Sequence, residues 1–173
     1  MRRWIALAPL IVLAALGVLF ATFGLHHDPH VNPAALVGKP LPDRTLPPLA
    51  GGAPVSLRST IQGPTVINAF ASWCVPCVQE APALMAMKAE GVRIVGVAYK
   101  NNPADAAAFL ARYGDPFATV LADRDGSVGL DLGVSGVPET FVVSAQVQII
   151  AKHSGPLEPA DVDALMAALA KGR

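Results

Sequence analysis

The strongest constraint on the fold is an alternation of strand-like and helix-like segments after residue 64. Strands are expected at 65–71, 92–98, 117–121, 139–144 and 147–153, and helices at 75–89, 103–113 and 159–170. Strand–helix–strand units pair their strands in parallel, whereas a hairpin pairs them antiparallel. The order therefore predicts an α/β domain with a mixed central sheet, half parallel and half antiparallel, flanked by helices.

The N-terminal segment is apolar. The 22 residues from Trp4 to Leu25 carry no charge, and Arg2 and Arg3 precede them. About 20 apolar residues cross the hydrocarbon core of a bilayer as a helix, and flanking positive charges stay in the cytoplasm. Residues 1–25 are thus predicted to be a single transmembrane anchor, a signal-anchor, with the rest of the chain across the membrane. A cleaved signal peptide is the alternative.

Residues 26–42 have no period and are rich in His and Pro, which predicts a linker. Its histidines, His26, His27 and His30, are interpreted as solvated spacer rather than as a metal site. The domain is predicted at 43–173, with an added β segment around Thr45–Leu57. Thirteen basic residues balance thirteen acidic ones, so no nucleic-acid partner is indicated, and neither a metal nor a cofactor is expected.

The only two cysteines, Cys74 and Cys77, lie in the sequence WCVPC, between the first predicted core strand and the first helix. Backbone N–H groups at a helix start favour a thiolate, which is the nucleophile in disulfide exchange. Cys74 is the expected nucleophile, and Cys77, one turn on, would resolve the mixed disulfide. A tetrahedral zinc site would need four ligands, and the sequence has no second CxxC or CxxH motif to supply them. A purely structural disulfide is also disfavoured, because a disulfide that closes so short a loop adds little stability.

The WCxxC motif resembles that of the thioredoxin superfamily, and residues 134–141 (VSGVPETF) resemble its second signature. The resemblance implies a thioredoxin-like fold and a cis Val137–Pro138 bond facing the dithiol. In that family, the residue before the proline offers its backbone to the substrate peptide. The chain resembles most the CcmG/DsbE type of thiol:disulfide interchange protein. Four stretches carry this closer likeness: LVGKP at 36–40, GVAYK at 96–100, DGSVGLDLGV at 125–134 and GVPETF at 136–141.

Several neighbours of the dithiol are expected to shape it. Trp73 provides a flat apolar surface, and Pro76 restricts the backbone between the cysteines. Asn68 stands where thioredoxins bury an aspartate, and it cannot titrate. The resemblance implies two acidic residues, Glu80 and Glu139, on an acidic rim that raises the thiol pKa. Tyr99 and Lys100 are expected either to shape the groove or to be plain loop residues.

The resemblance implies a periplasmic protein disulfide reductase of the bacterial inner membrane that acts in cytochrome c maturation. Its substrate would be the CxxCH disulfide of apocytochrome c or an assembly factor that presents it. Its electrons would come from a membrane thiol donor of the DsbD/CcdA kind. Two alternatives are a TlpA-like reductant that serves copper delivery to an oxidase, and a tethered module that binds metal through Cys74, Cys77 and a histidine.

Overall fold

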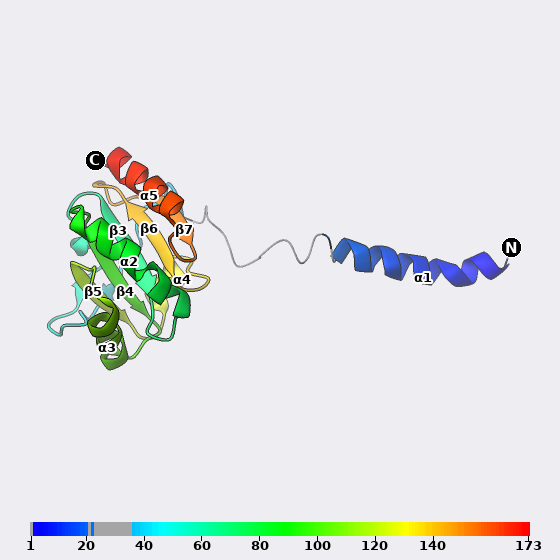
Figure 1. The fold of residues 1–173 in the computed structure, drawn as a ribbon, viewed down its shortest axis with the longest axis horizontal. Coiled ribbons are helices and arrows are strands. Elements are labelled where there is room, and N and C mark those ends of the chain that lie inside the picture. The colour runs from blue at the N-terminus through cyan, green and yellow to red at the C-terminus, as the bar shows by residue number, and fades with distance from the viewer. Residues whose placement is uncertain (1, 21, 23–35) are drawn as a thin grey trace. The chain divides into compact units, whose positions relative to one another are not determined.

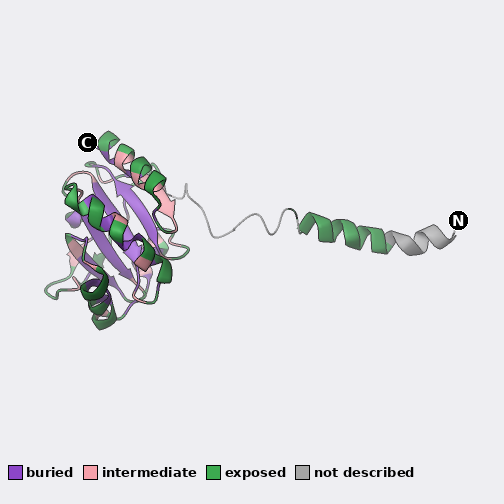
Figure 2. Ribbon diagram, in the orientation of Figure 1, coloured by how far each residue is buried: buried purple, intermediate pink, exposed green. Residues whose placement is uncertain are grey.

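The computed structural model describes residues 2–20, 22 and 36–173 (Figure 1). The chain divides into two compact units, 1–31 and 32–173. In the first unit, α1 spans Arg2–Leu19, and the side chains of residues 9–20 are exposed (Figure 2). Among the described residues, no helix combines the length and the apolarity needed to cross a bilayer. The predicted anchor therefore stays a prediction.

The second unit is built on a five-stranded sheet. Its strands are β3 (Thr65–Phe70), β4 (Ile94–Tyr99), β5 (Thr119–Asp123), β6 (Glu139–Val143) and β7 (Ile149–Ser154). They lie in the order β5-β4-β3-β6-β7, in which β3, β4 and β5 are parallel and β6 runs antiparallel to both β3 and β7. The predicted mixed sheet is confirmed.

Three helices cover one face of this sheet: α2 (Val75–Ala89), α3 (Pro103–Tyr113) and α5 (Pro159–Lys171) (Figure 1). The sequence predicted all three within a residue. The short helix α4 (Ser127–Asp131) was not predicted, because five residues show no helical period. It begins after Gly126, which has a φ of 77°, and the carboxylate of Asp123 accepts the backbone N–H groups of Val128 and Gly129. That carboxylate gives the helix its start.

The other face is covered by α4 and by the segment before β3. Two short strands, β1 (Thr45–Leu46) and β2 (Val55–Ser56), pair antiparallel, followed by the 3₁₀ turn η2 (Arg58–Thr60), so the predicted β segment is confirmed.

The predicted linker needs a correction at its end. The Leu41 side chain is fully buried in the core on this face, and its backbone N–H donates to the Val147 carbonyl at 2.9 Å. The N–H of Gly38 donates to the carbonyl of Ile149 at 2.8 Å. Residues 36–42 therefore pack as part of the domain, because a buried leucine outweighs the polar, proline-rich composition around it. Residues 26–35 lie outside the described part of the chain.

The central strand β3 positions the site. All six of its residues are buried, since β4 and β6 flank it and both faces of the sheet are covered (Figure 2). Phe70 at its end stacks on Phe117, with ring centroids 4.9 Å apart, and also contacts Phe109. The chain therefore leaves a rigid, packed strand just before it reaches the two cysteines.

Candidate active site

Cys74 is the N-cap residue of α2. Its backbone is extended, with φ −92° and ψ 105°, and its Sγ accepts a hydrogen bond from the Cys77 N–H at 3.1 Å. Pro76 lies in the first turn, where a helix has no need of its missing N–H. The prediction that Cys74 begins this helix with a backbone donor directed at its sulfur is confirmed. The helix start stabilises negative charge on that sulfur once the disulfide is reduced.

Cys74 and Cys77 form a disulfide, with their Cα atoms 5.3 Å apart. The two residues are 3% and 2% exposed, so burial does not distinguish the expected nucleophile from the expected resolving thiol. What distinguishes them is position. Cys74 caps the helix between the exposed side chains of Trp73 and Val75, whereas Cys77 lies within the first turn and lines a small internal cavity.

The loop before β6 forms the wall beside Cys74. The Val137–Pro138 peptide bond is cis, as the resemblance implied. The Val137 carbonyl oxygen lies 3.4 Å from Cys74 Sγ, a contact without a proton, since the sulfur is in a disulfide. A partner sulfur that attacks or is attacked at Cys74 must therefore approach alongside Val137.

A buried polar group lies beneath the dithiol. Glu80 is 1% exposed, and its Oε1 accepts a hydrogen bond from Asn68 Nδ2 at 2.8 Å. The same Asn68 nitrogen lies 3.1 Å from Thr140 Oγ1. Burial raises the pKa of Glu80 to about 7, although the Asn68 hydrogen bond favours the charged form. The Glu80 carboxyl is thus able to gain or lose a proton near neutral pH.

Glu80 shares a small cavity with Cys77. This cavity, of about 10 Å³, is lined by both residues and by Asn68, and Phe109 and Phe117 close it on the apolar side. The oxygens Glu80 Oε2 and Asn68 Oδ1 are buried and have no hydrogen-bond partner in the described structure. A backbone hydrogen bond from Leu157 also favours the charged form of this carboxyl, so burial outweighs two hydrogen bonds in raising the pKa of Glu80.

Glu139 differs from the expectation of an acidic rim. It is 1% exposed, and its Oε2 lies 2.9 Å from the Nζ of Lys152, close enough for an ion pair but not aligned as a directed hydrogen bond. Neighbouring residues of a strand point to opposite faces of its sheet, so Glu139 and Thr140 are on opposite faces. Thr140 faces Asn68 and Glu80. The two carboxylates are therefore both buried and lie on opposite faces of the sheet, because the β6 pleat separates them.

Trp73, Tyr99 and Lys100 lie at one corner of the site. The Trp73 side chain is 58% exposed, and its Nε1 donates to the Lys100 carbonyl at 3.3 Å. The Tyr99 ring packs so closely on Gly129 that a Cβ there would lie 2.3 Å from it. Tyr99 thus fixes α4 against the end of β4, and Lys100 positions the indole.

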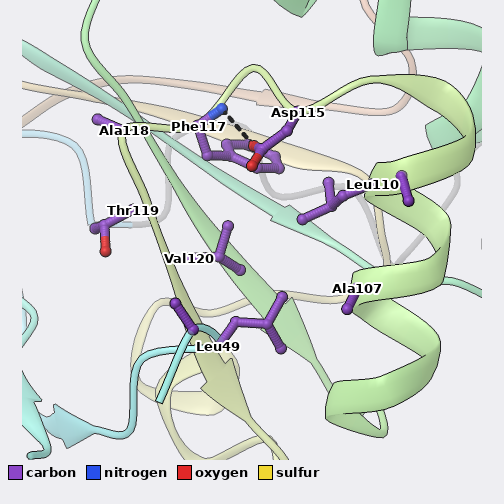
Figure 3. Close-up of a pocket in the computed structure, with 10 residues that line it drawn as sticks. Leu49, Ala107, Leu110, Asp115, Phe117, Ala118, Thr119 and Val120 are labelled. Atoms are coloured by element: carbon purple, nitrogen blue, oxygen red, sulfur yellow. Dashed lines mark hydrogen bonds between the residues drawn. The ribbon is translucent and has the colours of Figure 1, made fainter. Parts of the chain in front are cut away.

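A hollow of about 460 Å³ lies between α3 and the outer strand β5 (Figure 3). Leu110 and Phe117 line it as well as the small cavity beneath Cys77. None of the predicted site residues lines it, so it is not part of the dithiol site. Within the described residues, no group of three or more His, Cys, Asp or Glu side chains is placed to hold a metal ion. The linker histidines lie outside those residues.

A mixed sheet flanked by helices, a CxxC disulfide at a helix start and a facing cis-proline loop define a thioredoxin-like thiol–disulfide oxidoreductase. The Redoxin family model matches residues 36–169. The thiol:disulfide interchange protein HelX of Rhodobacter capsulatus is 40% identical over 91% of this chain and 90% of its own length. The thiol:disulfide interchange protein DsbE of Allochromatium vinosum is 41% identical over 88% of this chain and 85% of its own.

The comparison with solved structures supports the same class of protein. A structure described as a putative thiol:disulfide interchange protein DsbE from Chlorobium tepidum has 31% identity and a TM-score of 0.65, over 77% of this chain and 94% of its own. The chain belongs to the Redoxin family and, within it, to the DsbE-type thiol:disulfide interchange proteins.

Two residues of the site were missed by sequence reasoning. Thr140 could have been found from the sequence. It lies two positions after Pro138, and side chains two apart in a strand point to the same face of the sheet. Lys152 had no such local signal, because its contact with Glu139 depends on the register between β6 and β7, which places Phe141 opposite Lys152.

Proposed function

We propose that this chain is a membrane-anchored, periplasmic reductant that acts in cytochrome c maturation. It reduces the CxxCH disulfide of apocytochrome c, or of an assembly factor that presents it, and a membrane thiol donor of the DsbD/CcdA kind restores its own thiols. The observation that carries the proposal is the Cys74–Cys77 pair at the start of α2, facing Val137, in a chain of the DsbE type. The direction of electron flow follows the family resemblance.

The reaction proceeds in two exchanges. In the reduced protein, the Cys74 thiolate attacks one sulfur of the partner disulfide, and the other partner sulfur leaves as a thiolate. Cys77, as a thiolate, then attacks Cys74 in the mixed disulfide and releases the second partner sulfur. The partner gains two electrons and two protons and ends as a dithiol, and this chain ends with the Cys74–Cys77 disulfide seen in the structure.

Glu80 serves the second exchange. Cys77 must lose its proton before it attacks, and a general base works best when its pKa is near the ambient pH. The pKa of about 7 and the cavity shared with Cys77 make Glu80 the acceptor for that proton. Asn68 holds the carboxyl in place through Oε1.

The membrane anchor is the second part of the proposal. The described side chains of α1 that are large and apolar, Leu10, Leu13, Leu16 and Leu19 among them, are at least half exposed. Contiguous exposed apolar surface of this kind is typical of a segment that contacts a membrane or a partner. The full chain should therefore fractionate with membranes and the variant lacking residues 1–25 should not. Equal recovery of both in the soluble fraction would contradict the anchor.

A trapping experiment tests the enzyme. In Cys77→Ala, the mixed disulfide between Cys74 and the partner cannot be resolved. A disulfide-linked partner should therefore accumulate, and a thiol reagent should release it. Cys74→Ala is the matched control and should trap nothing. A trapped apocytochrome c or its assembly factor supports the proposal, whereas a trapped oxidase-assembly protein indicates the TlpA-like alternative. No thiol-linked partner at all would refute the proposed exchange.

The reduction potential of the Cys74–Cys77 pair tests the direction. Equilibration with glutathione or thioredoxin measures it. A reductant should have a value toward about −270 mV, and a value near about −120 mV would make this protein an oxidant instead.

A further inference from the structure

Lys152 on β7 has a charged group in the interior. Its side chain is 0% exposed, although the residue as a whole is half-buried, and its Nζ lies 2.9 Å from Oε2 of Glu139, which is buried. The same ammonium is 5.4 Å from the centroid of the Phe141 ring. Lysine is almost never fully buried unless it is paired, and a buried ion pair often adds no stability over apolar residues of similar size. The pair therefore calls for a role other than stability.

The pair holds the loop that precedes the cis-proline. Lys152 Nζ donates to the Gly133 carbonyl at 3.0 Å. On the other side, Glu139 Oε1 accepts hydrogen bonds from Ser135, from Oγ at 2.9 Å and from the backbone N–H at 3.3 Å. Ser154 Oγ on β7 also donates to this oxygen, at 3.2 Å. The ammonium and the carboxylate thus hold the loop at two points, Gly133 and Ser135, and tie both to β6 and β7.

This loop determines access to Cys74. Ser135 and Gly136 are exposed, so few core contacts hold them, and the next residue, Val137, places its carbonyl 3.4 Å from Cys74 Sγ. Because Cys74 is only 3% exposed, an incoming disulfide must fit beside Val137. A misplacement of about 1 Å in such a contact costs roughly 100-fold in rate.

We propose that Lys152 is a positioning residue that, with Glu139, sets the 133–138 loop for peptide disulfides at Cys74. Every incoming disulfide passes Val137, but a disulfide in a peptide also brings neighbouring backbone that must lie along the loop, whereas a small aromatic disulfide brings none. Lys152 therefore favours protein partners over small disulfides. This role rests on thiol–disulfide exchange at Cys74 and not on which partner supplies the disulfide.

Lys152→Met keeps an unbranched side chain of nearly the same length and removes its charge. With the reduced variant, the rate of reducing an oxidised CxxC peptide should fall by about tenfold or more, because the loop is no longer held. The rate of reducing a small aromatic disulfide such as 5,5′-dithiobis(2-nitrobenzoate) should stay within about twofold of the wild type, since this probe has no peptide backbone that must be aligned along the loop. Lys152→Arg should retain the peptide rate. Lys171→Met, at an exposed position on α5, is the matched control and should change neither rate.

The double variant Lys152→Met with Glu139→Gln separates positioning from folding. It leaves no unpaired buried charge, so it should recover the stability that Lys152→Met alone loses, and it tests the role even if the single variant folds poorly. Its peptide rate should stay low. Recovery of the peptide rate together with stability would overturn the proposal, as would an equal slowing of both probes in Lys152→Met or an unchanged peptide rate. Wild-type protein inactive on both probes would instead refute exchange at Cys74.

Discussion

Glu80→Gln should make the oxidised protein more stable above pH 7 and change it little near pH 4.5. Burial raises the pKa of Glu80 to about 7, against 4.5 for an unperturbed glutamate. The folded state therefore binds a proton that the unfolded chain has already lost between these two values. The stability from the protonated carboxyl is fully present below pH 4.5 and is lost as the pH rises through 7.

The size of the effect follows from the two pKa values. They differ by about 2.5 pH units, and each unit corresponds to about 1.36 kcal/mol, so wild-type Glu80 loses about 3 kcal/mol of stability across this range. Glutamine is uncharged at every pH and keeps an oxygen for Asn68 Nδ2.

Urea unfolding of the oxidised wild type and of Glu80→Gln, at intervals from pH 4.5 to 8.5, measures the difference. The variant should gain about 3 kcal/mol relative to the wild type by pH 8.5, with unchanged m values. Because other carboxylates titrate equally in both proteins, only the difference between them reports Glu80. Glu90→Gln, at the exposed end of the same helix, is the control. A difference that does not vary with pH would show that Glu80 is not held protonated, and the reasoning would be wrong.

Three further substitutions test the packing around the site. Asn68→Ala removes the donor to Glu80, so the pKa of Glu80 should rise further and the protein should lose about 1–3 kcal/mol, more at pH 8 than at pH 5, by urea unfolding; an equal loss at both pH values would contradict this. Gly129→Ala drives a Cβ into the tyrosine ring at the end of β4 and should cost about 1–3 kcal/mol, seen as a lower Tm, whereas Gly136→Ala, with nothing within 4 Å, should be neutral. Leu41→Ala should lower the free energy of unfolding by about 2–5 kcal/mol in the same assay, since this side chain is fully buried. An unchanged Tm would mean that residues 36–42 belong to the linker and not to the domain.

The elements of the domain were predictable because their signals are local. Hydrophobic period and proline positions are properties of adjacent residues, and they predicted α2 and α3 at their observed bounds. The short helix α4 escaped because five residues are too few for a period, and its start depends on the carboxylate of Asp123, at the end of β5. The burial of Leu41 was not predicted, because no pattern in the residues around it indicates that it packs in the core of the domain.

The dithiol, its place at a helix start and the proline that faces it can all be predicted from the sequence. These follow from the spacing of Cys74 and Cys77 and from the family motif around Pro138, and both are short-range patterns. The environments of Glu80 and Glu139, in contrast, depend on how distant segments fold together. Burial beside Cys77 makes Glu80 titrate near neutral pH, and the pleat of β6 turns Glu139 to the other face of the sheet. The physical reason is that desolvation and ion pairing depend on which distant segments pack together, and strand register sets this only when the sheet forms.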